Sequence, residues 1–266
     1  MARSVRDPQL ALRYRSKDGT WRGQHAGKRT GRPKSGLRAS ERHKAREPLN
    51  ARTPVHVVIR VTDEVGGLRK KRAFVAIREG LITILKRTDF RVVHLSIQAT
   101  HVHLLVEADS AEALSRGMQG FQISAAKHLN AELRDPETGK RRRGTVFPDR
   151  YHATQIGSPR AARNALSYIL NNWRKHREDR AAFTRTWRVD PFSSAVSLVD
   201  WRELAGQPWT WRLPRRGYVL PVAPAETWLL RIGWKRHGAI GATEVPGRRS
   251  EGVPRSGATA PSFDRS

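Results

Sequence analysis

The alternation of apolar and polar positions predicts most of the regular structure between residue 54 and about residue 173. Apolar residues at every second position indicate strands, and apolar residues three or four positions apart indicate amphipathic helices. Strands are therefore expected at 55–61, 90–99, 101–108 and 151–156, and helices at 69–88, 111–133 and 159–173. The turn between the two central strands is too short for a crossover, so these strands must pair antiparallel.

The order β-α-β-β-α-β-α of these segments predicts an α+β fold. The expected architecture is a ferredoxin-like antiparallel sheet with helices packed on one face. Ser110 is placed to cap the second helix, and Ser158 followed by Pro159 is a typical start for the third. Outside this domain the pattern predicts a basic N-terminal arm and a Trp/Arg-rich C-terminal extension.

Four segments follow from this division: an arm at 1–50, the α+β domain at 51–180, the extension at 181–246 and a Gly/Ser/Pro/Arg-rich tail at 247–266. The arm holds 14 Lys and Arg against 4 Asp and Glu, with almost no periodic apolar pattern. Such a segment buries too little surface to offset the entropy of ordering, so we expect both the arm and the tail to be disordered.

Two features outside the domain each leave two interpretations open. In the arm, Thr30-Gly31-Arg32-Pro33-Lys34 resembles a minor-groove AT-hook core, and a plain flexible basic tail is the alternative. In the extension, six of the eight tryptophans lie among Arg and Pro residues. These tryptophans would either stack on nucleic-acid bases or form a small packed subdomain.

Charge indicates a polyanionic partner. The chain has 51 Lys and Arg against 24 Asp and Glu, a formal net charge of +27. Nucleic acid is the simplest partner, with an anionic membrane surface or a generally Arg-rich composition as alternatives. The chain has no cysteine, which excludes disulfides, Cys-zinc sites and thiol catalysis. No apolar run approaches the length of a bilayer span, so we expect no membrane partner and a cytoplasmic protein, associated with the nucleoid when bound to DNA.

His101-Val102-His103 is the first candidate site. Side chains alternate along a strand, so both imidazoles lie on one face while Val102 and the following apolar positions face the helices. Two neighbouring imidazoles can chelate a divalent ion and leave positions open for water and phosphate. Two solvated histidines are the alternative for this pattern alone.

The third predicted helix carries the second candidate. Tyr168 lies roughly 130° from the centre of the apolar stripe at 100° per residue, and Asn172 follows one turn later, nearer the stripe's edge. A tyrosine placed only for packing would lie within the stripe. An interfacial tyrosine with its hydroxyl in water remains the alternative.

Three segments, in this order, resemble the single-tyrosine HUH transposases: THVHLLVEA (100–108), GTVFPDRYHA (144–153) and LSYILNN (166–172). The resemblance is closest to the REP-associated tyrosine transposases, relatives of the small IS200-like insertion-sequence transposases, and it covers roughly residues 54–180. It implies that His101 and His103 bind a divalent metal, that Tyr168 is the nucleophile and that Asn172 completes the metal site. Thr100 and Trp173 depart from the pattern, because relatives often have Asn and Pro there.

The resemblance also implies a mechanism. The metal polarises the scissile phosphate of single-stranded or hairpin DNA, and Tyr168 attacks to give a 5′-phosphotyrosine and a free 3′-hydroxyl. The nitrogen and oxygen ligands favour Mn²⁺, while Mg²⁺ is the commoner ion. Relatives work as monomers or homodimers. The competing hypotheses are a non-catalytic hairpin DNA- or RNA-binding protein of the same fold, and a nuclease that uses water.

Weaker candidates surround this site. Glu107 shares the strand face of the His pair and is a candidate base or accessory ligand. His94, on the neighbouring strand, is a candidate for supporting the ligands, with an ordinary strand histidine as the alternative. Tyr151 is expected to be structural. Basic residues expected to contact the DNA backbone, or else to form a solvated charged face, are Arg69, Lys70, Lys71, Arg72, Lys140, Arg141, Arg142, Arg143 and Arg150.

Overall fold

The computed structural model describes residues 48–134, 138–182, 184–205 and 219–247, together with the backbone of two short strands near the N-terminus. The chain divides into two compact units, Met1–His43 and Lys44–Ser266. In the first unit, β1 (Tyr14–Arg15) and β2 (Trp21–Arg22) form an antiparallel pair. The rest of the predicted arm up to residue 47, its AT-hook-like segment and the tail beyond residue 247 lie outside the described residues.

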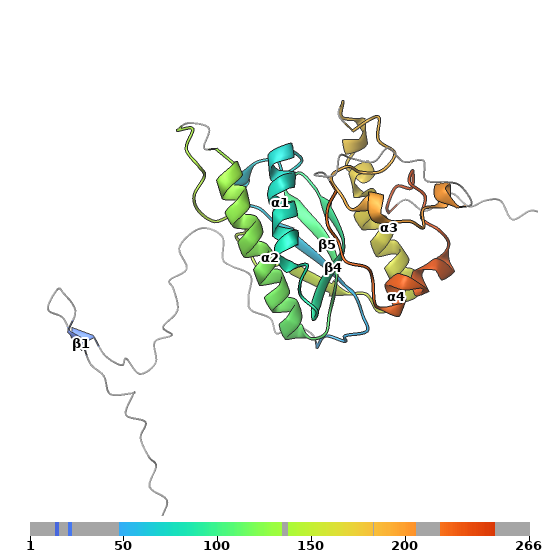
Figure 1. Ribbon diagram of the computed structural model, residues 1–266, viewed down its shortest axis with the longest axis horizontal. Coiled ribbons are helices and arrows are strands. Elements are labelled where there is room, and N and C mark those ends of the chain that lie inside the picture. The colour runs from blue at the N-terminus through green and yellow to red at the C-terminus, as the bar shows by residue number, and fades with distance from the viewer. Residues whose placement is uncertain are drawn as a thin grey trace, which may run out of the picture. The chain divides into compact units, whose positions relative to one another are not determined.

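The second unit is built on a four-stranded antiparallel sheet with the order β4-β5-β3-β6 (Figure 1). Its strands are β3 Val55–Arg60, β4 Phe90–Ile97, β5 His101–Ala108 and β6 His152–Gln155. Helix α1 (Lys71–Ile84) connects β3 to β4, and α2 (Ala111–Glu132) connects β5 to β6. This order and connectivity confirm the predicted α+β, ferredoxin-like fold.

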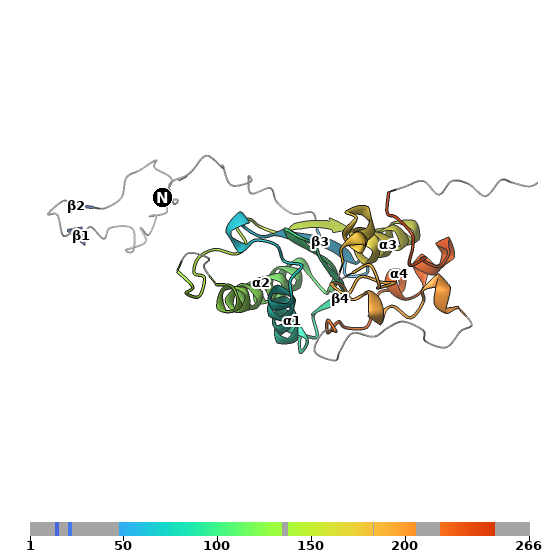
Figure 2. The same ribbon diagram turned by 90° about the horizontal axis from the view of Figure 1, so that it is seen from above.

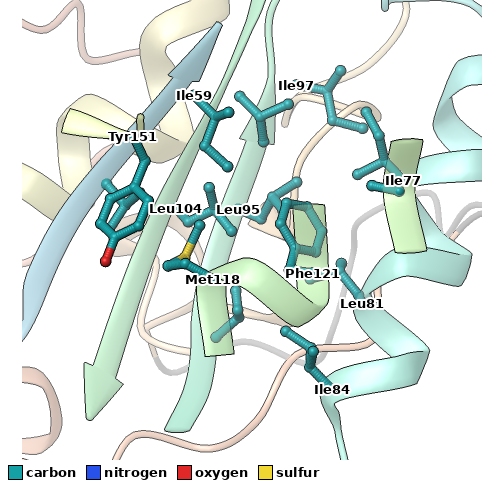
Figure 3. Close-up of a cluster of buried hydrophobic side chains, with 14 of the residues drawn as sticks. Ile59, Ile77, Leu81, Ile84, Leu95, Ile97, Leu104, Met118, Phe121 and Tyr151 are labelled. Atoms are coloured by element: carbon teal, nitrogen blue, oxygen red, sulfur yellow. The ribbon is translucent and has the colours of Figure 1, made fainter. Parts of the chain in front are cut away.

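The main hydrophobic core lies between the sheet and the α1–α2 pair (Figure 3). Alternate residues of β3 and β5 supply its sheet side, as the period-two pattern predicts. The two helices approach closely at Gly80, where an added Cβ would lie 2.9 Å from the Cβ of Ala125. Tyr151 is buried in the same core, which agrees with its predicted structural role.

Helix α3 (Pro159–Lys175) lies on the opposite face of the sheet from α1 and α2 (Figures 1 and 2). Its N-cap Ser158 accepts a hydrogen bond from the backbone N–H of Ala161, as predicted. Its apolar stripe packs on Val93 and Leu105 in a second core. The expectation of helices on one face therefore holds for α1 and α2 and is wrong for α3, because β4 and β5 also present apolar residues on their other face.

The extension completes this second core. Trp201 and Trp234 are buried beside α3 together with Leu198 and Ile240. The prediction of base stacking is therefore wrong for these two tryptophans. They are packed, as the alternative predicted, but against α3 and not in a separate subdomain. Trp209 and Trp211 lie outside the described residues.

The remaining described helices are short: η2 Asp63–Val65, η3 Glu178–Arg180, η4 Ala195–Ser197, η5 Arg202–Leu204, α4 Trp228–Arg231 and η7 Gly233–His237.

The extension also binds α3 through polar groups. Asn171 Nδ2 donates to the carbonyl of Gly241 at 2.9 Å, and Ser167 Oγ donates to Glu244 at 2.7 Å. Among the described helices, none is both long and apolar enough to cross a membrane.

Candidate metal and tyrosine site

The two histidines of β5 lie on the face of the sheet that α3 covers. Their Nε2 atoms are 3.0 Å apart, while Val102 and Leu104 point into the main core on the other side. His103 is buried with 3% of its surface exposed, and His101 is half-buried. The alternation along the strand thus brings the two imidazoles together as the sequence predicts.

Each of these imidazoles has a partner at its second ring nitrogen. His103 Nδ1 lies 3.0 Å from Nε2 of His56, and His101 Nδ1 lies 3.3 Å from Oγ1 of Thr100. His56 is on β3, where Val58 is the direct cross-strand neighbour of His103, so His56 is a diagonal neighbour. The two Nε2 atoms therefore face each other, while both Nδ1 atoms contact neighbouring side chains.

Tyr168 is brought to this cluster by α3. Its ring is 5.2 Å from the ring of His103 and 5.8 Å from that of His56, centre to centre, with edge-to-face geometry in both contacts. The Nζ atom of Lys175 lies 5.3 Å from the centre of the tyrosine ring. The position of Tyr168 outside the apolar stripe of α3 is explained by these contacts with the histidines.

Asn172, one helical turn after Tyr168, is fully buried. Neither its Oδ1 nor its Nδ2 has a hydrogen-bond partner within the described part of the chain. A buried amide without partners costs about 1–3 kcal/mol of folding free energy, and native proteins rarely keep such a group without another use for it.

Burial keeps the imidazoles neutral. Desolvation and the neighbouring His56 lower the pKa of His103 to about 3. Burial, assisted by His152, lowers the pKa of His56 to about 4, and burial, followed by Arg60 and His176, lowers the pKa of His101. Neutral imidazoles keep a lone pair on one ring nitrogen, which is the form that binds a metal.

The geometry of the pair fits a divalent cation. Two ligand atoms each about 2.1 Å from a metal and at right angles to each other are about 3.0 Å apart, which matches the observed Nε2–Nε2 distance. No group of three or more His, Asp or Glu side chains in the described ranges is arranged to hold a metal. The buried, unpartnered amide of Asn172 is therefore the remaining candidate for a third protein ligand.

Comparison with known families identifies the domain that carries this cluster. Residues 51–172 match the family model described as "Transposase IS200 like". Over this segment, somewhat less than half of the chain, the protein is similar to the IS200-like transposases. The matched segment includes His101, His103 and Tyr168 and ends at Asn172. This match confirms the resemblance to the small insertion-sequence transposases.

Two solved structures are similar to this chain. One is a REP-associated tyrosine transposase bound to a REP hairpin, with 13% identity, a TM-score of 0.47 and coverage of 68% of this chain and 98% of the other. The second is a protein from Deinococcus radiodurans R1 described as a candidate transposase, with 15% identity, a TM-score of 0.32 and coverage of 52% and 98%. Among curated protein sequences, none matches this chain.

The two accessory candidates have hydrogen-bond partners other than the His pair. Glu107 is four residues beyond His103 on β5, or about 13 Å along the strand. Its carboxylate accepts hydrogen bonds from the backbone N–H groups of Glu226 and Thr227, at 2.8 and 2.9 Å. His94 is buried, with Nδ1 3.0 Å from Oγ of Ser194. Both residues thus have partners in the extension. Glu107 lies away from the imidazoles, whereas His94 pairs opposite Leu105 and is a diagonal neighbour of His103, with its ring turned to Ser194.

The basic residues divide into two groups. The side chain of Arg69 is 9% exposed and forms a two-pronged ion pair with Asp190 at 2.9 and 3.0 Å. Arg142 contacts Asn130 at 2.6 Å and the carbonyl of Thr145 at 2.8 Å. The guanidinium groups of both residues thus make contacts within the domain, and their contact with DNA stays a prediction. The exposed members are Lys70, Lys71, Arg72, Lys140, Arg141, Arg143 and Arg150.

Sequence reasoning overlooked three residues of the cluster. His56 occupies a partly buried position on β3, and Lys175 and His176 lie at the C-terminal end of α3. A histidine between the valines of a predicted strand was the available signal for His56, since alternation places it opposite the core. No local pattern could have shown that β3 pairs beside His103.

Proposed function

We propose that this IS200-like transposase domain cleaves and rejoins single-stranded DNA through a covalent bond to Tyr168, with a divalent cation held by His101, His103 and Asn172. The contact between the Tyr168 and His103 rings, 5.2 Å apart, carries the proposal. Hydrophobic packing does not require a phenol on α3 to lie beside two neutral imidazoles on β5. A phosphoryl-transfer site does require a nucleophile close to the metal ion that activates the phosphate.

The proposed chemistry is a transesterification. The phenol of Tyr168 loses its proton to solvent and its oxygen forms a bond to the scissile phosphorus. The bond from phosphorus to the 3′ oxygen breaks, and that oxygen takes up a proton from solvent. The product is a 5′-phosphotyrosine with a free 3′-hydroxyl, so the phosphodiester energy is retained for rejoining.

The protein groups around the phosphate have distinct roles in this proposal. When bound, Mg²⁺ or Mn²⁺ supplies positive charge to the phosphate oxygens. The ammonium of Lys175, near the Tyr168 ring, adds positive charge beside the phenol and the incoming phosphate. The exposed basic residues that contact the DNA backbone are Lys70, Lys71, Arg72, Lys140, Arg141 and Arg143.

The proposed substrate is single-stranded DNA, including DNA that folds into a hairpin. The net charge of +27 supports a polyanionic partner. A similar solved protein, the REP-associated tyrosine transposase, is bound to a REP hairpin, which makes hairpin DNA a reasonable first substrate to offer.

A covalent-adduct assay tests the proposal. The full-length protein is mixed with labelled single-stranded DNA from the regions that flank its own gene, with Mn²⁺ or Mg²⁺, and separated on a denaturing gel. We expect a protein–DNA band that disappears in Tyr168→Phe and in His101→Ala. The matched control is Tyr151→Phe, a tyrosine buried in the main core, which should keep the band.

The other outcomes separate the competing functions. An adduct that survives Tyr168→Phe would place the nucleophile on another tyrosine. Cleavage without an adduct would indicate a nuclease that uses water. Tight binding of hairpin DNA without cleavage would indicate a binding protein of the same fold.

A further inference from the structure

The contacts of the Nδ1 atoms, which are the ring nitrogens not facing the other histidine, distinguish His103 from His101. A neutral imidazole that binds a metal through Nε2 carries its proton on Nδ1, and the group that accepts this proton sets the tautomer and the ring orientation. His103 Nδ1 meets Nε2 of His56 at 3.0 Å in a partly buried contact. His101 Nδ1 meets the exposed hydroxyl of Thr100 at the longer distance of 3.3 Å.

We propose that His56 is a positioning residue for the metal site. In the metal-bound protein, neutral His56 accepts the Nδ1–H of His103 and thereby holds the His103 lone pair at Nε2, pointing toward His101. This inference rests on the proposed function, because it takes His101 and His103 as metal ligands.

The geometry favours this role over direct ligation by His56. Its Nε2 is directed at Nδ1 of His103, which lies across the ring from the Nε2 atoms that face each other. A cation bound between those Nε2 atoms is therefore on the other side of the His103 ring from His56. His56 can act on such a cation only through His103.

The surroundings of His56 restrict its motion. Backbone pairing of β3 with both β5 and β6 places it inside the sheet rather than at an edge. Its ring makes an edge-to-face contact with Tyr168, 5.8 Å between ring centres, and a stacked contact with His103, 5.2 Å between ring centres. These two contacts hold the His56 ring from two sides. His56 thus joins the proposed nucleophile and a proposed ligand, so its orientation affects both.

The chemical nature of the acceptor has a consequence for metal affinity. Metal-bound histidines commonly donate to a carboxylate or a carbonyl. A neutral imidazole brings no negative charge, so His103 remains a weaker donor and the cation retains more of its charge for phosphate. Within this proposal, His56 favours charge on the cation over tight binding of the cation.

Metal affinity in two matched variants tests the role. His56→Phe keeps a ring against Tyr168 but removes the acceptor, and His56→Gln keeps an acceptor oxygen but removes the ring. Mn²⁺ binding to the full-length, DNA-free protein is measured from the EPR signal of the free ion. Folding of each variant is checked by thermal unfolding.

We expect His56→Phe to weaken Mn²⁺ binding by about 10–100-fold, which is the usual effect of removing such a partner. His56→Gln should stay within a few fold of the wild type. The control is His128→Phe, an exposed histidine on α2, on the other side of the sheet from the His pair, which should leave Mn²⁺ affinity unchanged.

A second measurement follows the tautomer directly. In ¹⁵N spectra of histidine-labelled protein saturated with diamagnetic Zn²⁺, His103 should carry its proton on Nδ1. The Nδ1 signal should shift in His56→Phe and return toward its wild-type position in His56→Gln, a pattern that a purely structural role would not produce.

The outcomes separate the two proposals. Equal Mn²⁺ affinity in wild type and in folded His56→Phe would overturn the role of His56 and leave the metal site intact. Equal losses in the Phe and Gln variants would also overturn it, because packing rather than hydrogen bonding would then be responsible. A wild-type protein that binds no Mn²⁺, or that binds it equally well as His103→Ala, would remove the metal from the proposed function and this inference with it.

Discussion

The two ends of one face of β5 use buried polar side chains in opposite ways. At the C-terminal end, Glu107 is buried and its oxygens accept three hydrogen bonds from Glu226 and Thr227 at 2.7–2.9 Å. At the N-terminal end, the Nε2 atoms of His101 and His103 meet only each other among their hydrogen-bonded contacts in the described chain. On α3, which covers this face of the sheet, the amide of Asn172 has no partner among the described residues.

This difference separates structure from chemistry on a single strand. A carboxylate whose lone pairs are occupied by protein donors stabilises the fold and has little capacity left for a ligand. Imidazoles and an amide that keep their lone pairs lower stability and remain available to a cation or a phosphate. The α+β domain therefore uses the Glu107 end to attach the C-terminal extension, and we expect the histidine end to carry the reaction.

The largest expected effect is at the histidine end. We expect His103→Ala to reduce the DNA-cleavage rate by about 1000-fold, because a metal contributes several kcal/mol to the transition state and each ~1.4 kcal/mol is a factor of ten. Its free energy of unfolding should fall by less than about 2 kcal/mol, because the cavity left by the ring is partly offset by the removal of a buried polar group. Single-turnover cleavage with Mn²⁺ and urea unfolding measure the two quantities. A variant that cleaves at the wild-type rate would remove His103 from the site.

Glu107→Ala should show the reverse pattern. We expect it to lower the free energy of unfolding by about 3 kcal/mol, since it leaves the partly buried N–H groups of Glu226 and Thr227 without their acceptor and removes one of the carboxylates beside Arg91. Cleavage measured well below the melting temperature should persist. The control is Glu112→Ala, which removes an exposed ion pair with Arg116 and should cost little. Loss of cleavage in folded Glu107→Ala would contradict the division of β5 into two functional ends.

A third buried group gives the same face a pH dependence. Burial lowers the pKa of His94 from 6.5 to about 4. Between pH 6.5 and 4 the imidazole of His94 binds a proton in the unfolded chain but not in the folded protein. The free energy of unfolding is therefore highest above pH 6.5 and decreases as the pH falls toward 4. We expect His94 to account for about 2 kcal/mol of the loss between pH 7 and 4.5. Urea unfolding across this range should show a shallower pH dependence in His94→Gln, and an identical slope would refute the assignment.

The smallest effect is the most specific. Asn172→Leu keeps the branched shape of the side chain and removes two buried polar atoms without partners, so we expect a stability gain of about 1 kcal/mol together with weaker Mn²⁺ binding. Asn171→Leu is the matched neighbour. It loses the hydrogen bond to Gly241 and should be destabilised. If both variants lose stability, Asn172 has a structural partner and is not held in reserve for a ligand.

The parts of the fold that depend on local periodicity could be predicted from the sequence. Period-two alternation placed both imidazoles of His101 and His103 on one face, and the 3.6-residue period placed Tyr168 outside the apolar stripe of its helix. The caps at Ser110 and Ser158 were predictable for the same reason, because the donor and acceptor are three residues apart.

Long-range partners could not be predicted in this way. The Arg69–Asp190 pair joins residues 121 positions apart, and a run of basic residues looks the same in sequence whether its first member is buried or faces DNA. Glu107 was equally ambiguous, since its partners lie about 120 positions later. The neighbourhood of His56 and His103 depended on which strands pair.

By itself, the sequence determined the order of strands and helices, the shared face of the two histidines, and the residue types for a metal and tyrosine site. Only the tertiary structure decided that α3 lies across the sheet from α1 and α2 and that Tyr168 contacts His103 there. It also decided that Glu107 and His94 make their hydrogen-bond contacts with residues of the extension. Local patterns record which face of an element is apolar. Which apolar face packs on which, and which polar groups are left without partners, depends on contacts between segments that only the folded chain brings together.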